Sequence, residues 1–282
     1  MNSYAGIFLF ILSLLLFGVI VGGFAFSIIK TRNKKVRYLI GTHIGKRAIQ
    51  QDSISILEPL DGNKVDCIAL LSDGMSRLNY GEYASRYVVS QMSKKLLEMK
   101  DICKDIEALK KEVYSISYNL FQESLQKGPM GATLIICLIK KGYLYWLSVG
   151  DSRIFMLRNN ELIQLNETHD YFNFLLEKVM AEETTKAEAV FDAQCQNITS
   201  YMGQKVLNQI DYNLQPYKLK KYDKLFICTD GITKSLSKED IKSVLNNTES
   251  NNVVGSIIEK VINYNLPDQD NMSTVLIEYL GE

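Results

Sequence analysis

Two stretches that lie far apart in the chain share one pattern, an apolar run that ends in Asp-Gly. The first is residues 69–75, Ala-Leu-Leu-Ser-Asp-Gly-Met, and the second is residues 224–231, Lys-Leu-Phe-Ile-Cys-Thr-Asp-Gly. A single Asp-Gly is weak evidence of a site, because this dipeptide is common in turns. Two such stretches predict buried strands that bring Asp73 and Asp230 together at one site.

Further acids stand beside small or turn-forming residues. The full set is Asp52, Asp73, Asp151, Asp230 and Asp270. Each alone fits a solvated turn residue, but together they would repel one another and need a cation. Carboxylate and carbonyl oxygens favour Mg²⁺ or Mn²⁺ over Zn²⁺. Two such ions can share a carboxylate, lower the pKa of a bridging water and hold a phosphate for in-line attack.

Composition narrows the class of protein. The chain has 282 residues, of which 46% are hydrophobic, enough for one sizeable core or two small ones. Lys plus Arg and Asp plus Glu number 32 each, so no broad basic surface for nucleic acid is expected. The five cysteines show no CxxC spacing and fit a reducing compartment better than a disulfide framework. The presence of only two histidines argues against a His-rich zinc centre.

The N-terminal segment predicts a membrane helix. Ala5 to Ile29 are 25 positions without a charge, longer as a helix than the roughly 30 Å hydrocarbon core of a bilayer. A cleaved signal peptide is the alternative, but no Lys or Arg precedes the run and no Ala-x-Ala site follows it. Basic residues from Lys30 to Arg37 come directly after the run. By the positive-inside rule, we expect a single-pass protein of the cell membrane whose C-terminal part is cytoplasmic.

We therefore divide the chain into residues 1–37, a transmembrane helix with a basic juxtamembrane segment, and residues 38–282, one globular domain. Gly18 and Gly22 have the GxxxG spacing that permits helix dimerisation. Because glycine is frequent in membrane helices, the spacing alone favours no dimer.

Hairpins and helices are expected in separate blocks of the globular part. Apolar runs and turn residues predict strands over residues 52–57, 67–72, 133–139, 143–149, 153–157, 161–165, 223–228 and 274–279. Helices are predicted twice within 81–127, at the start of 169–217, after an N-cap at Ser237 and over 253–264. This order favours an α+β fold with antiparallel sheet over a doubly wound parallel fold.

Several motifs resemble the metal-dependent Ser/Thr protein phosphatases of type 2C, in the family's order. They are Gly-Lys-Arg-Ala-Ile-Gln-Gln-Asp at 45–52, Ser-Asp-Gly-Met at 72–75, Gly-Glu-Tyr-Ala-Ser at 81–85, Gly-Ala-Thr at 131–133, Val-Gly-Asp-Ser-Arg at 149–153, Asn-Ile-Thr-Ser-Tyr-Met-Gly at 197–203, Thr-Asp-Gly at 229–231 and Asp-Asn at 270–271. The resemblance covers about residues 39–280. Several separate motifs in register argue against coincidence.

The resemblance implies a four-layer α-β-β-α sandwich of two antiparallel sheets flanked by helices, with a metal centre at one end. It implies an enzyme that hydrolyses phosphoserine or phosphothreonine in proteins, the targets of a Ser/Thr kinase. The predicted N-terminal helix would anchor this enzyme to the membrane. Its cofactors would be two Mn²⁺ or Mg²⁺ ions, with a third in bacterial-type members. A catalytically impaired, phosphatase-like scaffold is the alternative.

The resemblance also assigns roles at the centre. Asp73 would bridge both metals, with the Gly74 carbonyl on one ion and Asp230 and Asp270 on the other. Asp52 would act close by, through water. The expected catalytic residues are Asp73, Asp230 and Asp270.

Two further residues complete the expected site. Asp151 matches the position that, with Asp230, holds the third and weaker metal. Arg47 would bind the substrate phosphate, since a guanidinium fork suits phosphate oxygens. A surface arginine is the alternative, but the place of Arg47 five residues before Asp52 favours the phosphate role.

The chain departs from the family pattern near the expected centre. Gln51 stands where the family usually has Glu, which predicts weaker metal binding, and Ser76 replaces a glycine. Met75 takes the place of a His that some relatives have been proposed to use as general acid, so no general acid is named. His169 is expected to be structural. The retained acids and Arg47 argue against the scaffold.

Overall fold

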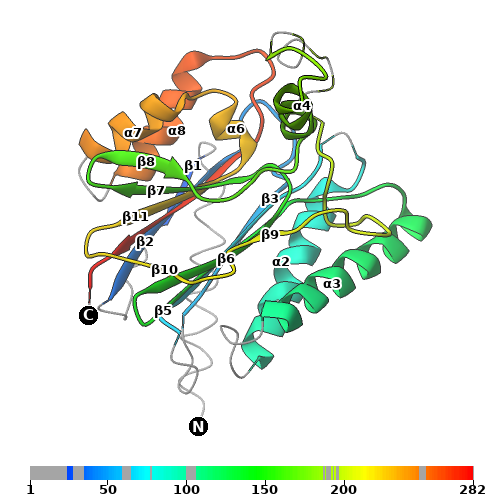
Figure 1. Cartoon of the computed structure of the whole chain (residues 1–282), viewed down its shortest axis with the longest axis horizontal. Coiled ribbons are helices and arrows are strands. Elements are labelled where there is room, and N and C mark those ends of the chain that lie inside the picture. The colour runs from blue at the N-terminus through cyan, green and yellow to red at the C-terminus, as the bar shows by residue number, and fades with distance from the viewer. Residues whose placement is uncertain are drawn as a thin grey trace.

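Two antiparallel sheets lie face to face, with helices on the outer face of each (Figure 1). The computed structural model describes residues 24–27, 35–58, 65–76, 78–99, 106–186, 188, 192, 194, 197–247 and 252–281. The two facing sheets with helices on their outer faces confirm the predicted α+β sandwich.

The first sheet has the strand order β1-β2-β12-β11-β7-β8. These strands are β1 Phe24–Ser27, β2 Val36–His43, β12 Met272–Tyr279, β11 Lys224–Cys228, β7 Arg153–Arg158 and β8 Glu161–Gln164. The second sheet has the order β10-β6-β5-β4-β3, and β9 pairs with β6. These strands are β10 Tyr217–Lys218, β6 Tyr143–Val149, β5 Leu134–Lys140, β4 Cys67–Asp73, β3 Asp52–Leu57 and β9 Asp211–Tyr212.

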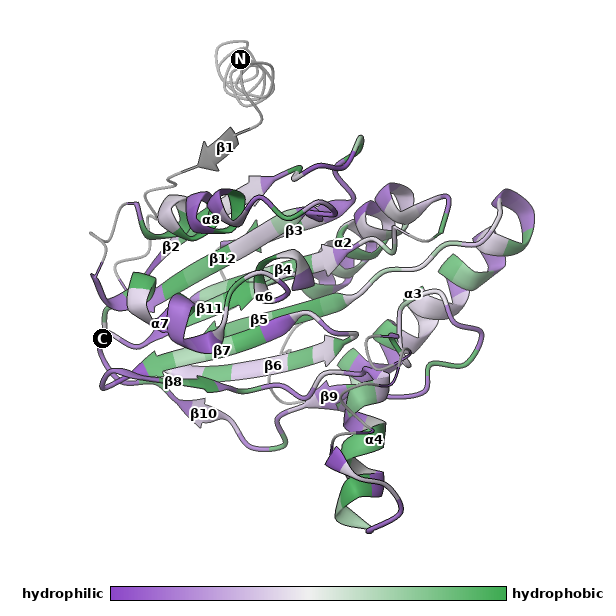
Figure 2. Ribbon diagram, turned by 90° about the horizontal axis from the view of Figure 1, so that it is seen from above, coloured by the Kyte–Doolittle hydropathy of each residue, from purple (hydrophilic) through white to green (hydrophobic). Residues whose placement is uncertain are grey.

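Helices cover both outer faces of the sandwich (Figure 1). The helices over the second sheet are α2 Gly81–Glu98 and α3 Ile106–Lys127. Those over the first sheet are α6 Asp230–Thr233, α7 Lys238–Asn247 and α8 Val253–Tyr264. Helix α4, Tyr171–Met180, projects beyond the sandwich in Figures 1 and 2.

Strand β4 is apolar from Cys67 to Leu71, and both of its faces are buried there. Cys67, Ala69 and Leu71 belong to the apolar cluster between the two sheets. Ile68 and Leu70 alternate with them and pack in the cluster under α2 and α3. The side-chain period of two in a strand thus divides one continuous run between two layers of core.

Strand β11 is built in the same way on the other sheet. Leu225 and Ile227 face the layer between the sheets, whereas Phe226 and Cys228 pack in the cluster that includes residues of α7 and α8. Figure 2 shows the hydrophobic colour of these inner strands. Both Asp-Gly stretches therefore follow central strands whose positions are fixed by core on both sides.

Local signals agree with the observed turns and caps. Lys141 and Gly142 have φ of 50° and 72°, as a two-residue type I′ hairpin requires. At the start of α7, the Asp240 backbone N–H donates to Ser237 Oγ and the Ser237 N–H donates to the Asp240 carboxylate, both at 3.1 Å. This reciprocal pair confirms the predicted N-cap.

The N-terminal prediction needs a correction at its end. Phe24–Ser27, which fall within the predicted membrane helix, form strand β1 and pair with residues 40–43 of β2. The helix prediction is wrong for these residues, because the edge of β2 offers backbone partners to an extended segment. Residues 5–23, with the GxxxG glycines, lie outside the described residues. No helix in the described part of the chain is long and apolar enough to cross a bilayer.

Candidate metal centre

Adjacent strands place Asp52 and Asp73 opposite each other. The register of β3 and β4 pairs these two residues directly. The Asp73 backbone N–H donates to Thr133 Oγ1 at 2.9 Å, and its carbonyl accepts from the Thr133 N–H at 2.8 Å. Thr133 Oγ1 also shares a hydrogen bond of 2.9 Å with Ser152 Oγ. The end of β4 is therefore held on its far side by the segment that leads into β5.

The second Asp-Gly stretch meets the first through Thr229. Asp230 is the first residue of α6, and Thr229 alone separates it from the end of β11. The hydroxyl of the preceding Thr229 donates to Asp52 Oδ2 at 3.2 Å, and its backbone N–H donates to the Ser273 carbonyl at 3.0 Å. Thr229 thus ties the ends of the two sheets together and brings Asp230 toward Asp52.

Asn271 brings the third acidic loop to the same place. Its Oδ1 accepts from the backbone N–H of Gln51 at 2.8 Å, and its Nδ2 donates to the carbonyl of Ile44 at 2.8 Å. Because Asn271 directly follows Asp270, these bonds fix the Asp270 loop against the segment that leads into β3.

The glycines that follow Asp73 and Asp230 permit close packing of the loops. A Cβ at Gly74 would lie 2.2 Å from the Gly81 carbonyl oxygen, and a Cβ at Gly231 would lie 2.0 Å from the Asn271 carbonyl oxygen. The Gly74 N–H donates to the Gln51 carbonyl at 3.1 Å. Any side chain at these two positions would push the loops of the site apart.

Four of the predicted acids line one cavity of about 440 Å³. Its described lining residues are Asp73, Met75, Ser76, Thr133, Asp151, Asn197, Ile198, Asp230, Lys234 and Asp270. Asp52 is not among them but is paired with Asp73. The structure therefore brings together the acids that the sequence predicted, from both sheets and their connecting loops.

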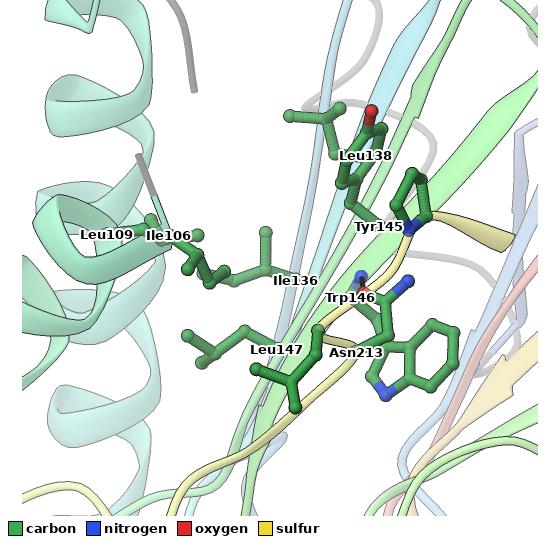
Figure 3. Close-up of a pocket in the computed structure, with 10 residues that line it drawn as sticks. Ile106, Leu109, Ile136, Leu138, Tyr145, Trp146, Leu147 and Asn213 are labelled. Carbon is green, nitrogen blue, oxygen red and sulfur yellow. Dashed lines mark hydrogen bonds between the residues drawn. The ribbon is translucent and has the colours of Figure 1, made fainter. Parts of the chain in front are cut away.

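A second cavity, of about 240 Å³, lies between α3 and strands β5 and β6 (Figure 3). It is lined by Ile106, Leu109, Ile136, Leu138, Tyr145, Trp146, Leu147, Asn213, Leu214 and Pro216. None of these described side chains carries a carboxylate or a cation, so this cavity does not suit a metal ion or a phosphate.

The acids are held in a low-dielectric setting. Burial raises the pKa of Asp52 to about 7 and that of Asp151 to about 8, and the carboxylate of Asp230 adds to both effects. Burial, and then the surrounding carboxylates, raise the pKa of Asp73 well above its ordinary range. Asp52 Oδ1 and Asp151 Oδ1 are buried and accept no hydrogen bond. Buried carboxylate oxygens without donors fit a cation.

Two protein cations already contact the acids. Arg47 Nε donates to Asp270 Oδ1 at 2.8 Å and its Nη2 donates to Oδ2 at 3.0 Å. Lys234 forms an ion pair with Asp230. Among the residues that the structure describes, no three His, Cys, Asp or Glu side chains already lie close enough together to bind one metal ion. Arg47 and Lys234 thus supply positive charge to Asp270 and Asp230.

Some contributors escaped the sequence analysis. Thr133 and Thr229 were not predicted as supports, since their hydrogen-bond partners are distant in sequence. Lys234 had a usable signal, because a lysine four residues after an acid on a helix pairs with it. His169 is buried and its Nδ1 accepts the Gly150 backbone N–H at 3.1 Å, in agreement with the expected structural role.

Comparison with known proteins identifies the family. Residues 41–280 match the family described as Protein phosphatase 2C. The chain belongs to this family. The serine/threonine phosphatase stp of Listeria welshimeri is 27% identical over 218 residues, 75% of this chain and 84% of that relative. Protein phosphatase PhpP of Streptococcus pneumoniae is 28% identical over 181 residues, 62% of this chain and 71% of that relative.

Solved structures share the fold. The serine/threonine phosphatase of S. agalactiae matches with a TM-score of 0.76 at 24% identity, over 87% of this chain and 99% of that one. The catalytic domain of PstP, solved in complex with two manganese ions, matches with a TM-score of 0.65 at 22% identity, over 87% and 99%. The predictions of a type 2C phosphatase fold and of a phosphoprotein phosphatase enzyme are confirmed.

Proposed function

We propose that this protein phosphatase 2C removes phosphate from phosphoserine and phosphothreonine in proteins, by direct attack of water at a centre of two Mn²⁺ or Mg²⁺ ions. The observation that carries the proposal is the convergence of Asp73, Asp151, Asp230 and Asp270 on one cavity, with Asp52 paired to Asp73. The relatives named serine/threonine phosphatases, and the related structure with two manganese ions, support the substrate class and the metal.

Five residues would hold the two ions. Asp73 would contact both, Asp52 and the Gly74 carbonyl would serve one side, and Asp230 and Asp270 the other. Such ions supply a water activated for attack and positive charge beside the phosphoryl oxygens. The fixed backbone of Asp73 keeps its carboxylate in place, and the Thr229 hydroxyl orients Asp52.

Arg47 would bind the phosphate group after leaving Asp270. Its guanidinium forms a bidentate pair with that carboxylate, the same geometry that it would use on two phosphoryl oxygens. Its side chain is 39% exposed, so it can turn toward an incoming substrate. A cation bound to Asp270 would weaken the ion pair between this carboxylate and the Arg47 guanidinium.

The membrane anchor is a further part of the proposal. Residues 5–23 would reach about 28 Å as a helix, close to the roughly 30 Å hydrocarbon core. With the basic residues before β2 on the cytoplasmic side, the catalytic domain would face phosphoproteins of the cytoplasm. The division of the chain at residue 38 stays a prediction, and β1 shows that the sheet includes residues before it. Recovery of the full chain in the aqueous rather than the membrane fraction of its cells would contradict the anchor.

Hydrolysis by an Asp73 variant tests the catalytic proposal. The full chain is assayed for phosphate release from a phosphothreonine peptide with Mn²⁺, beside Asp73→Asn and the matched control Asp268→Asn, whose residue is exposed and does not line the cavity. We expect loss of activity only in Asp73→Asn. Equal activity of that variant would refute the site, and a wild-type chain that binds Mn²⁺ without hydrolysis would favour the scaffold.

A further inference from the structure

Lys234 places a protein cation among the acids. It directly follows helix α6, and its backbone N–H donates to the Asp230 carbonyl at 2.7 Å. Its Nζ forms an ion pair with Asp230 Oδ2, four residues earlier. Of the described residues that line the acidic cavity, Lys234 is the one with a cationic side chain. Both ends of the lysine are thus tied to Asp230.

Asp151 lines the same cavity as Lys234. Asp151 Oδ1 is buried without a hydrogen-bond donor, so it needs a positive charge nearby. Asp151 and Asp230 are the pair that the sequence predicted to hold a third, weaker metal ion. Lys234 lines the cavity together with both of these acids and is paired with one of them.

We propose that the ammonium of Lys234 takes the place of a third metal ion between Asp151 and Asp230, so that the loaded protein holds two divalent ions. The inference rests on the proposed two-ion centre and differs from the expectation of a third ion. Two divalent ions and one ammonium together balance the charge of Asp52, Asp73, Asp151, Asp230 and Asp270. A further divalent ion would be repelled by the ammonium and left with a carboxylate already paired.

The Lys234 pair is local, with a lysine side chain that is 45% exposed, whereas the Arg47 pair joins distant parts of the chain. Lys234 and Asp230 are four residues apart, so the turn of α6 itself sets their approach. Asp230 is only 14% exposed, which limits competition from water for its oxygens. Arg47, by contrast, reaches Asp270 from a separate loop 223 positions away.

Counting bound ions tests the inference without relying on activity. The full chain is equilibrated with Mn²⁺ over a range up to millimolar concentration, and bound manganese per chain is measured by equilibrium dialysis with elemental analysis. The variants are Lys234→Met and the matched control Lys238→Met, an exposed lysine that does not line the cavity. We expect two ions in the wild type and in Lys238→Met. Lys234→Met should bind a third ion at least roughly tenfold more tightly than the wild type does, the effect of removing one nearby like charge.

The outcomes separate the inference from the proposed function. Three ions in the wild type, or two in Lys234→Met, would overturn the role of the lysine and leave the two-ion centre standing. Fewer than two ions in the wild type would refute the centre itself. A double variant, Lys234→Met with Asp151→Asn, should return to two ions if the new site is the one between Asp151 and Asp230. If the double variant still binds a third ion, that ion lies at another site, and the inference is contradicted.

Discussion

Asp52→Asn should stabilise the metal-free protein at pH 8. Burial raises the pKa of Asp52 from 3.8 to about 7. Above pH 7 the folded chain therefore holds a buried negative charge that lowers its free energy of unfolding. At about 1.4 kcal/mol per pKa unit, that cost is at most about 4 kcal/mol. Because Asp52 keeps some exposure to solvent, we expect about half of it, about 2 kcal/mol. Asparagine lacks this charge and can still accept the hydrogen bond from Thr229.

The stabilisation by Asp52→Asn should increase with pH. Between about pH 4 and pH 7 the folded chain retains a proton on Asp52 that the unfolded chain has released. The free energy of unfolding therefore falls as the pH rises through this range, and the advantage of Asp52→Asn grows with it. Its cause is the same burial that prepares the carboxylate for a cation.

Thermal unfolding of the full chain in EDTA at pH 5 and pH 8 provides the assay. About 2 kcal/mol corresponds to roughly 4–8 °C in Tm at pH 8, with a clearly smaller shift at pH 5. Saturating Mn²⁺ should reverse the order, since the wild type gains more from the ion. The exposed Asp268→Asn is the control. A variant that is no more stable than the wild type at pH 8, or a gain that does not change with pH, would refute the reasoning.

Two more variants test neighbours of the acids. Arg47→Ala should raise KM for a phosphothreonine peptide by roughly 10- to 100-fold, because a charge-assisted bidentate contact is lost. Arg47→Lys should recover part of this loss. An unchanged KM in steady-state kinetics would rule out the phosphate role. Gln51→Glu should tighten Mn²⁺ binding by about tenfold through the added negative charge, as measured by calorimetry. Affinity equal to that of the wild type would mean that residue 51 does not face the ions.

Much of the fold could be predicted from local pattern. Strands β4 and β11 were found because burial on both faces makes them continuously apolar, and α8 was predicted over its observed range, Val253–Tyr264. Strand β2 was missed, because Arg37 and Gly41 interrupt its apolar residues. Strands β9 and β10 have two residues each, too few to show any period.

The site was predictable where the sequence itself marks it. The acids followed strands or stood in tight turns, so their convergence could be inferred. Thr229 could not be assigned, because the carboxylate that it orients is 177 positions away. Lys234 was overlooked since a lysine four residues after an acid is usually a surface pair. Only the fold shows that this pair shares a cavity with Asp151 and Asp270.

The location of bound manganese is the most direct test of the proposed centre. A crystal of the full chain grown with Mn²⁺ would be measured at the manganese absorption edge, so that anomalous difference density marks the ions. We predict two ions that share the carboxylate of Asp73, with Asp230 and Asp270 on one of them and Arg47 released from Asp270. Ions bound away from Asp73, or no ion in this cavity at saturating Mn²⁺, would contradict the account.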